Sequence, residues 1–336
     1  MNLRIIFTFL SGFIIWSCSN DGAVNSGVKT SAIAQLYATT QNGEVKQYDI
    51  NTGKVSTFSL NSGGAQGVDI DGDRDLMTIV SRNSNRLEQY YGIGAYGAGS
   101  RVDLEADTFG GSHLQSPRDL AVSGNFYVVS DNTDIDRDET TPEGRFFIYE
   151  ATSDEFILRN VVTTKFKVWG IEFIGEDLYA AVDETNKVAQ YKNFLESYKT
   201  NQLITANKIV AFQGLVRTHG MDHEDGIMVL TDIGETESST DGALFVVENF
   251  EQKFSQAQNG FIDADQLLKI AGNNTLLGNP VNVIYDSGYN AIFVAEATNN
   301  GGRVLAFNNA TSVSGNISPD LKYLLPGVSS VFFHTR

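Results

Sequence analysis

The sequence predicts an all-β domain, a six-bladed β-propeller of four-stranded antiparallel blades, and three observations support this fold class. Six short apolar runs of one shape recur, with starts 40, 50, 52, 49 and 65 residues apart. Recurrence at this spacing is typical of propellers and solenoids, whose units bury their faces against their neighbours. The composition, with 32 Gly and 5 Pro, suits strands joined by tight turns. The first repeat also lacks a strand that the C-terminus supplies, as a closed ring requires.

Five repeats are predicted to contain four strands in order. Innermost strands begin the repeats at Gly67, Asp119, Gly170, Gly220 and Asn282. The recurring apolar runs form the second strands, at Leu76, Phe126, Leu178, Ile227 and Ile292, with Leu36 in the first repeat. Third strands begin at Asn85, Gly144, Asn186, Gly242 and Gly302, and fourth strands lie at Val102, Phe156, Ile209, Leu267 and Leu321. Each repeat is therefore expected to be a meander.

The first repeat is incomplete. Its runs start at Leu36, Gly43 and Lys54, and no innermost strand precedes them, whereas "VSSVFFHTR" from Val328 is left over at the C-terminus. Pairing of this last strand into the first blade removes the open edges of a linear array. We therefore predict a closed ring and one domain over residues 33–336.

The stretch "VDIDGDRD" at residues 68–75 has the alternating carboxylates of a calcium loop. It also joins two predicted strands, so we interpret it as a hairpin with Val68 and Ile70 buried and its turn from Asp71 to Arg74. Calcium binding there is retained as the alternative, on the face away from the loops that carry the candidate site.

Residues 1–17 are predicted to be a signal peptide. Arg4 precedes the apolar stretch from Ile5 to Trp16, and Cys18 is the sole cysteine. This arrangement resembles a bacterial lipoprotein signal, which implies lipidation of Cys18, a flexible tether over residues 18–32 and a place in the cell envelope. An ordinary secretory signal with an incidental cysteine is the alternative. Both interpretations make the protein exported.

Charge excludes one class of partner. The chain carries a net charge of −17 and has no basic run. Nucleic-acid binding needs clustered Lys and Arg, so we expect no nucleic-acid partner. Membrane contact is expected through the lipid anchor only.

Two stretches resemble repeats of the NHL family: "GVDIDGDRDLMTIVSRNSNRL" from Gly67 and "PVNVIYDSGYNAIFVAEATNNGGRV" from Pro280. The resemblance covers about residues 33 to 336 and implies architecture more than activity. It also implies that the loops entering the innermost strands and those leaving the second strands gather on one face. We call this face the mouth.

The mouth is the predicted ligand site. Its inlet positions, which lead into the innermost strands, hold Gln66, Arg118, Trp169, His219, Val281 and Ser329. Its exit positions, after the second strands, hold Asp131, Asp183, Asp232 and Glu296, with Gln41 and Arg82 in the other two blades. We assign ligand binding to Gln66, Arg118, Trp169, His219, Asp131, Asp183, Asp232 and Glu296. The alternatives are that the acids cap turns, that His219 packs at a blade junction and that Trp169 belongs to the core.

A calcium-dependent hydrolase is the alternative function. Gluconolactonase- and paraoxonase-like propellers hold such an ion in the mouth through Glu, Asn and Asp ligands. By that resemblance Asp119 and Asn282 are candidate metal ligands, but Ser329 and Ser330 stand where the leading Glu is expected. No Gly-x-Ser-x-Gly motif occurs either. We therefore expect a binding module for a protein, a glycan or a polar small molecule rather than an enzyme.

One insertion in the third repeat has the spacing of a calcium loop. In "NTDIDRDETTPE" from Asn132 to Glu143, oxygen-bearing side chains stand at positions 1, 3, 5, 7, 9 and 12. The candidate calcium ligands are Asn132, Asp134, Asp136, Asp138 and Glu143. Arg137 occupies the position that needs Gly in such loops, so a solvated acidic insertion is the alternative.

Overall fold

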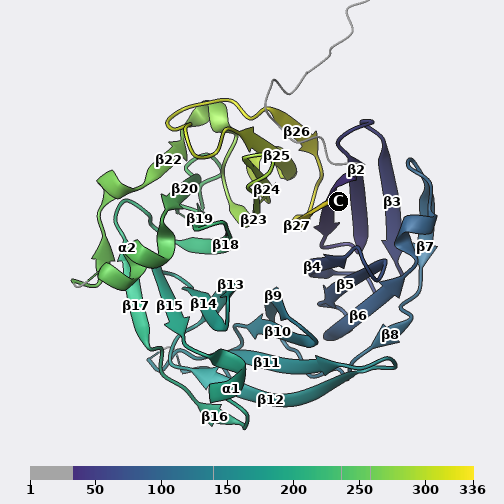
Figure 1. Ribbon diagram of the computed structural model, residues 1–336, viewed down its shortest axis with the longest axis horizontal. Helices are drawn as coiled ribbons and strands as arrows, with labels where there is room; N and C mark the ends of the chain where they lie inside the picture. The colour runs from purple at the N-terminus through teal and green to yellow at the C-terminus, as the bar shows by residue number, and fades with distance from the viewer. Residues whose placement is uncertain (1–32, 139, 236, 258) are drawn as a thin grey trace, which may run out of the picture.

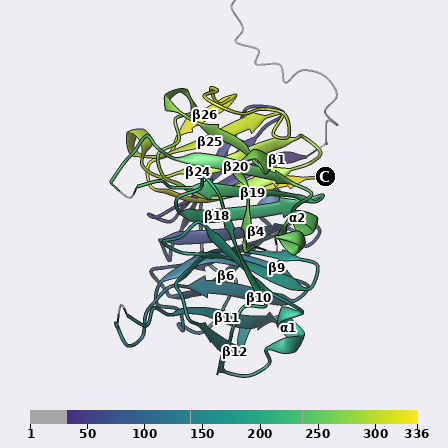
Figure 2. The ribbon, with the colours of Figure 1, turned by 90° about the vertical axis from the view of Figure 1, so that its left-hand side faces the viewer.

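The computed structural model describes residues 33–336 except 139, 236 and 258. Six small sheets stand in a ring around a central axis, as Figure 1 shows in face view and Figure 2 from the side. The predicted six-bladed β-propeller is therefore confirmed. The predicted signal peptide, the tether and Cys18 lie outside the described residues. Within the described part of the chain, no helix is long and apolar enough to span a membrane.

Each blade contains four successive antiparallel strands, which follow one another from the axis outward. Blade 1 consists of β27 (Val328–Thr335), β1 (Ala34–Thr40), β2 (Glu44–Asp49) and β3 (Val55–Leu60). Blade 2 consists of β4 (Ala65–Asp71), β5 (Leu76–Ser81), β6 (Arg86–Tyr91) and β8 (Thr108–Phe109). Blade 3 consists of β9 (Pro117–Ser123), β10 (Phe126–Asp131), β11 (Gly144–Ala151) and β12 (Phe156–Thr164).

The other three blades follow the same order. Blade 4 consists of β13 (Val168–Ile174), β14 (Asp177–Val182), β15 (Lys187–Tyr191) and β17 (Lys208–Phe212). Blade 5 consists of β18 (Thr218–Glu224), β19 (Ile227–Asp232), β20 (Ala243–Glu248) and β22 (Leu268–Ala271). Blade 6 consists of β23 (Pro280–Asp286), β24 (Ala291–Glu296), β25 (Arg303–Asn308) and β26 (Leu321–Leu324). Two short helices, α1 (Phe194–Ser197) and α2 (Phe250–Gln256), follow the third strands of blades 4 and 5.

The ring closes as predicted. The C-terminal strand β27 pairs antiparallel with β1, with Ala38 opposite Val331. Beyond the paired strands, Ile33 and Arg336 exchange two backbone hydrogen bonds of 3.0 and 3.1 Å. The first blade thus takes its innermost strand from the far end of the chain.

In several blades, the connection between the third and fourth strands contains a short extra strand. This strand pairs with the outermost strand of the preceding blade. The stretch at Val102, predicted as the fourth strand of the second blade, forms β7 (Arg101–Leu104), which pairs parallel with β3 of blade 1. That prediction was wrong, because the long connection between β6 and β8 reaches back to the neighbouring edge. In the same way β16 (Gln202–Leu203) pairs with β12 and β21 (Phe261–Ile262) pairs with β17. Edge strands that would otherwise be open are covered.

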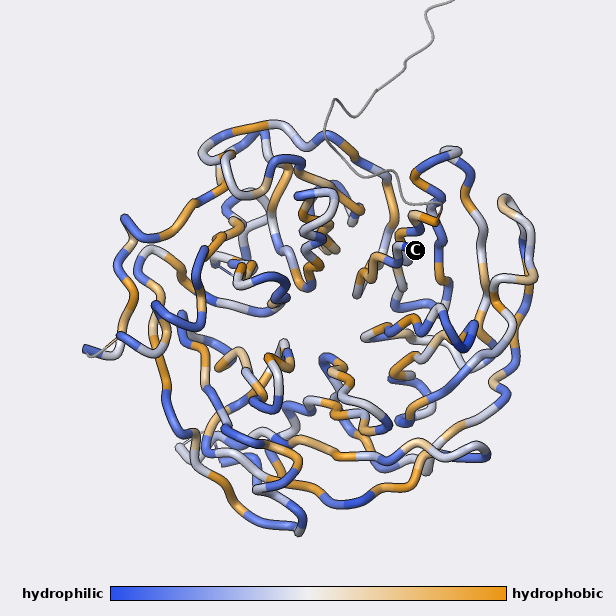
Figure 3. The backbone as a smooth tube through the Cα atoms, in the orientation of Figure 1, coloured by the Kyte–Doolittle hydropathy of each residue, from blue (hydrophilic) through white to orange (hydrophobic). Residues whose placement is uncertain are grey.

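The core lies between neighbouring blades. The second strand of each blade, such as β5, β14 and β19, is almost wholly buried. Apolar side chains of adjacent sheets pack together into clusters, for example Tyr179, Met221 and Phe245 between blades 4 and 5. Figure 3 shows apolar residues along the strands of every blade. The hairpin interpretation of residues 68–75 is confirmed, because Val68 and Ile70 are buried and residues 72–75 form the turn between β4 and β5.

Candidate functional site

The mouth is defined by one backbone hydrogen bond that recurs in all six blades. In each blade, the backbone amide of the residue that follows the second strand is the donor. The acceptor is the backbone carbonyl of the residue two places before the inlet position, at an N···O distance of 2.7 to 3.2 Å. The pairs are Gln41–Gly327, Arg82–Gly64, Asn132–Ser116, Asp183–Lys167, Ile233–Arg217 and Ala297–Asn279. The predicted inlet positions are therefore equivalent in the ring, and they lie on the same face as the exits.

Four inlet residues contact one another in series across adjacent blades. Gln66 Nε2 donates to the Arg118 carbonyl at 3.2 Å. The Arg118 guanidinium lies over the Trp169 ring at 4.2 Å from its centroid. On its other side, Trp169 stacks on His219 with the ring centroids 3.7 Å apart and the planes 8° from parallel. The mouth thus contains a continuous stack of Arg118, Trp169 and His219, which cation–π attraction stabilises.

Three of the predicted exit acids bind backbone amides. Asp131, Asp232 and Glu296 are each the last residue of a second strand. Each accepts hydrogen bonds from two consecutive amides of the inlet loop, at distances of 2.7 to 3.0 Å. Their contacts are those of the turn-capping alternative. Their assignment to ligand binding stays a prediction.

Asp131 illustrates the electrostatics of this position. Burial alone would raise the pKa of its carboxyl. The amides of Gln115, Thr133 and Ser116 and the Arg145 guanidinium, at 3.1 Å, outweigh burial and lower the pKa overall. Asp131 therefore stays ionised and holds the inlet loop of its own blade.

Asp183 differs, because it lies one residue beyond the position of the other three acids. The last residue of β14 is Val182, so Asp183 is equivalent to Asn132 and not to Asp131. Its carboxylate lies 3.2 Å from Arg217 Nη2 and 3.3 Å from His219 Nε2. Burial acts to raise the pKa of Asp183, but His219 and Arg217 lower it to about 2. Burial also lowers the pKa of His219, so at neutral pH Asp183 is the charged member of this pair.

The residues at two further inlet positions, Ser329 and Val281, contact neighbouring strands and the apolar core. Ser329 is 2% exposed and its Oγ donates to the Ala65 carbonyl at 2.6 Å. Val281 packs against the apolar cluster between blades 6 and 1. The stack is thus confined to the side of the mouth formed by blades 3 to 5.

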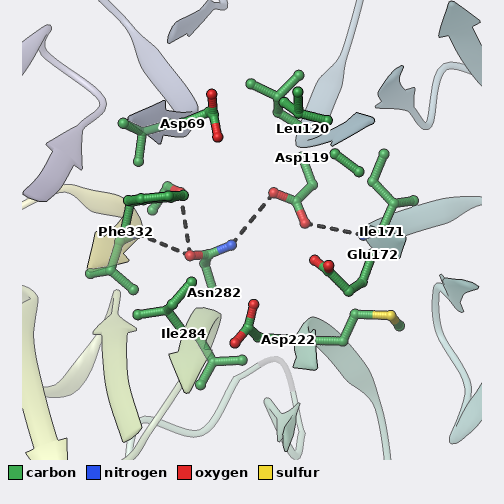
Figure 4. Close-up of a pocket in the computed structure, with 16 residues that line it drawn as sticks. Asp69, Asp119, Leu120, Ile171, Glu172, Asp222, Asn282, Ile284 and Phe332 are labelled. Atoms are coloured by element: carbon green, nitrogen blue, oxygen red, sulfur yellow. Dashed lines mark hydrogen bonds between the residues drawn. The ribbon is translucent and has the colours of Figure 1, made fainter. Parts of the chain in front are cut away.

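Below the mouth, the innermost strands enclose a channel along the axis. Its cavity of about 170 Å³ is lined by residues of all six inner strands. Six polar side chains line it: Ser330 and the five that Figure 4 labels, Asp69, Asp119, Glu172, Asp222 and Asn282. Four of them are acids, so the axis of the ring carries a concentration of carboxyl groups.

Asp119 and Asn282, both predicted as metal ligands, meet in this channel. Asn282 Nδ2 donates to Asp119 at 3.5 Å, although the residues come from blades on opposite sides of the axis (Figure 4). The Ile171 amide donates to the second oxygen of Asp119 at 3.1 Å, and the Val331 amide donates to Asn282 Oδ1 at 2.9 Å. The two side chains are therefore fixed by backbone donors of neighbouring blades.

The channel acids hold their protons more tightly than exposed acids do. Burial raises the pKa of Asp69 to about 6, with a further contribution from Asp71. Burial likewise raises the pKa of Asp119 and of Asp222 to about 7. It raises the pKa of Glu172 well above its usual value, and the charges of Asp222 and Asp119 add to the rise. We therefore expect these buried carboxyl groups to be partly protonated near neutral pH.

Sequence reasoning missed Asp69, Glu172 and Asp222. A signal for them exists, because they occupy the third position of the aligned stretches "GVDI", "GIEF" and "GMDH". In the ring this position faces the channel in each of those blades. An acidic residue at one register of three repeats is thus the pattern that would have found them.

The predicted calcium loop lies beside the mouth. Asn132 Nδ2 lies 3.4 Å from Asp183. Asp134, Asp136 and Asp138 accept hydrogen bonds from amides of their own loop at 2.9 to 3.0 Å, and Glu143 lines a shallow groove at its end. Among the described residues, no group of three or more His, Cys, Asp or Glu side chains is placed to hold a metal. Calcium stays a prediction at both places.

Comparisons with known proteins show the fold alone. No protein-family model and no curated protein matches the chain. Among 840 matching chains of solved structures, one comes from a complex described as "Crystal structure of Nidogen/Laminin Complex". It is 13% identical, with a TM-score of 0.59, and the match covers 89% of this chain and 98% of that chain. This similarity supports a β-propeller, whereas the NHL repeat type stays a prediction.

Proposed function

We propose that the protein is an interaction module that binds its ligand at the mouth. The observation that carries this proposal is the set of buried polar atoms without a hydrogen-bond partner there. Among the described residues, Arg118 Nε, Trp169 Nε1, Arg217 Nε and His219 Nδ1 belong to this set. Buried donors and acceptors in native proteins are nearly always satisfied by protein or ordered water, and a group of open ones on one face supports a ligand as their partner.

A protein is the partner that this surface fits best. Two exposed apolar side chains lie on loops of the mouth, Ile135 at 59% in the exit loop of blade 3 and Val216 at 53% in the inlet loop of blade 5. Exposed apolar groups around convergent polar ones are typical of protein interfaces. The structural neighbour is likewise part of a protein complex, by its description. A glycan or a polar small molecule is the competing ligand class.

The binding test compares matched variants of the full chain as bait in an extract of its own cells. A partner that recognises the mouth should be retained by the unaltered protein and by Tyr91→Ala, and lost with Trp169→Ala. Tyr91 is a suitable control because it is an exposed aromatic residue on the outer part of blade 2. Equal retention by all three proteins would contradict binding at the mouth.

Export and anchoring belong to the same proposal. The sequence from Arg4 to Cys18 supports them. Growth of the producing cells with an alkyne-tagged fatty acid should label the wild-type chain, and Cys18→Ala should abolish the label. Recovery of an unlabelled wild-type chain inside the cytoplasm would contradict both export and lipidation.

A metal-dependent hydrolase is the second candidate, because Asp119 and Asn282 converge in the channel. Calorimetric titration with calcium, followed by a panel of lactones and esters, tests it. Metal-dependent turnover that Asp119→Ala and Asn282→Ala abolish is the expected result for an enzyme. Turnover that survives both substitutions would assign the activity elsewhere.

A further inference from the structure

We propose that Arg82 and Arg118 together form a receptor for a carboxylate side chain of the protein partner. This inference rests on the proposed binding at the mouth and names the chemistry that the mouth recognises. Arg82 follows β5 of blade 2 and Arg118 lies at the inlet of blade 3, so the two arginines belong to adjacent blades.

The arginines at the mouth differ in their pairing. Arg145 lies 3.1 Å from Asp131 and Arg217 lies 3.2 Å from Asp183. Neither Arg82 nor Arg118 has a carboxylate within ion-pair distance among the described residues. Other described arginines, such as Arg101 and Arg159, also lack an ion pair, but Arg82 and Arg118 occupy the exit and inlet positions of adjacent blades at the mouth.

Arg118 is held in place without using its donors. Its carbonyl accepts the hydrogen bond from Gln66, and its guanidinium lies over the Trp169 ring. Stacking on a ring leaves the N–H groups of a guanidinium free, because these lie in its plane. Arg118 Nε indeed has no hydrogen-bond partner among the described residues. The side chain is therefore oriented in advance, which lowers the entropy lost on binding.

The two arginines also repel each other. Burial and then the charge of Arg82 lower the pKa of Arg118 to about 10, and the charges of Asp183 and Asp131 oppose this only in part. An anion between the two guanidinium groups relieves this repulsion and supplies acceptors for the free donors. A planar carboxylate matches the fork of a guanidinium, and such pairs give strong, oriented hydrogen bonds.

A carboxylate presented by a protein fits better than a free anion does. The overall negative charge of the chain repels anions at long range, so attraction depends on short-range contacts. Val216 and Ile135, exposed on loops of the same face, offer such contacts to a protein surface but not to a free anion. The receptor is thus expected to select an Asp or Glu side chain within a protein surface.

Trp169 gives a direct readout. The sequence has two tryptophans, and the other, Trp16, lies in the predicted signal peptide. The full chain with Trp16→Phe therefore reports on Trp169, which contacts Arg118. The probes are capped tripeptides, Ala-Asp-Ala and Ala-Glu-Ala, with the neutral isosteres Ala-Asn-Ala and Ala-Gln-Ala and with inorganic phosphate as a further arm.

The acidic peptides should change the emission of Trp169 in a saturable way, and the neutral ones should bind at least about tenfold more weakly. Arg82→Gln should lower the affinity by about tenfold, and so should Arg118→Lys, which keeps the charge but loses the fork. Arg101→Gln, on the outer edge of blade 1, is the matched control and should bind as the parent does. Circular dichroism establishes that each variant is folded.

Equal binding of neutral and acidic peptides, or full affinity in Arg82→Gln, would overturn the receptor. Binding of phosphate without binding of the acidic peptides would also overturn it, in favour of a phosphate site. A partner that is lost with Trp169→Ala yet retained by Arg82→Gln would leave mouth binding intact and refute the carboxylate receptor alone.

Discussion

Replacement of Asp69 by Asn should stabilise the ring at neutral pH and have little effect in acid. Asp69 lies on β4 and faces the channel. None of the hydrogen bonds among the described residues involves its side chain, so the isosteric amide removes the charge without breaking a contact. The effect therefore reports the cost of burying one carboxylate in the channel.

The magnitude follows from the shift in pKa. The folded pKa of Asp69 is about 6, against 3.8 for the ordinary group. As the pH rises between these values, the unfolded chain loses its proton first, so the stability of the folded state falls until about pH 6. Each pH unit corresponds to about 1.4 kcal/mol, which gives at most about 3 kcal/mol. Asp69→Asn should gain this amount at about pH 8 and almost nothing at about pH 4.

Urea unfolding followed by circular dichroism at several pH values measures the difference. Asp71→Asn is the matched control, two residues further along the same strand. Burial acts to raise the pKa of Asp71, but hydrogen bonds from Arg74 and Asp73 lower it overall. Asp71→Asn should therefore lose up to about 1 kcal/mol at neutral pH. Equal stability of Asp69→Asn and the parent at every pH, or a gain in Asp71→Asn, would refute the reasoning.

Three further predictions concern other parts of the ring. Glu172→Gln should raise the urea midpoint at about pH 8 more than at about pH 4, because burial beside Asp222 and Asp119 raises the pKa of Glu172; an equal rise at both would contradict it. Asp131→Asn should lower the free energy of unfolding by about 2 kcal/mol at neutral pH. The loss of stability caused by Asp131→Asn should become smaller in acid, where the Asp131 carboxylate of the parent is protonated too. The same loss at every pH would contradict this prediction. Deletion of residues 328–336 should abolish cooperative unfolding and give aggregates in size-exclusion chromatography, because blade 1 loses its innermost strand; deletion of Arg336 alone is the control.

The inlet side of the mouth could be predicted because the inner strands align without ambiguity. Each predicted inlet residue lies at the same place in the recurring hydrogen-bond pattern. On the exit side the predicted acids occupy two neighbouring places, because Asp131, Asp232 and Glu296 end their strands whereas Asp183 follows β14. The apolar runs at Phe126, Leu178 and Ile227 look equivalent, but β14 begins at Asp177, where β10 has Phe126 and β19 has Ile227. Because β14 starts with the polar Asp177, its apolar run starts one residue later in the strand, at Leu178. The exit position expected from that run is therefore also one residue later, at Asp183.

The channel and the stack depend on distances across the ring. Asp119 and Asn282 are 163 residues apart and come from opposite blades, so no local pattern pairs them. The contact of Trp169 with Arg118 and His219 similarly requires the spacing between neighbouring blades. The misplaced strand at Val102 shows the same limit, because its partner β3 belongs to another repeat. Repeat patterns predicted which residues share a face, and the closed ring decided which of them touch.

The closure of the ring also fixes how the molecule is presented. Strand β1 runs from Ile33 toward the mouth, where Gln41 bonds to Gly327. At its other end, Ile33 pairs with Arg336, whose guanidinium lies 3.5 Å from Asp73 in the turn on the opposite face. Ile33, the first described residue, therefore lies on the side away from the mouth. Both ends of the described chain thus share one face of the ring, and the Arg118–Trp169–His219 stack lies on the other, where the ends cannot obstruct it.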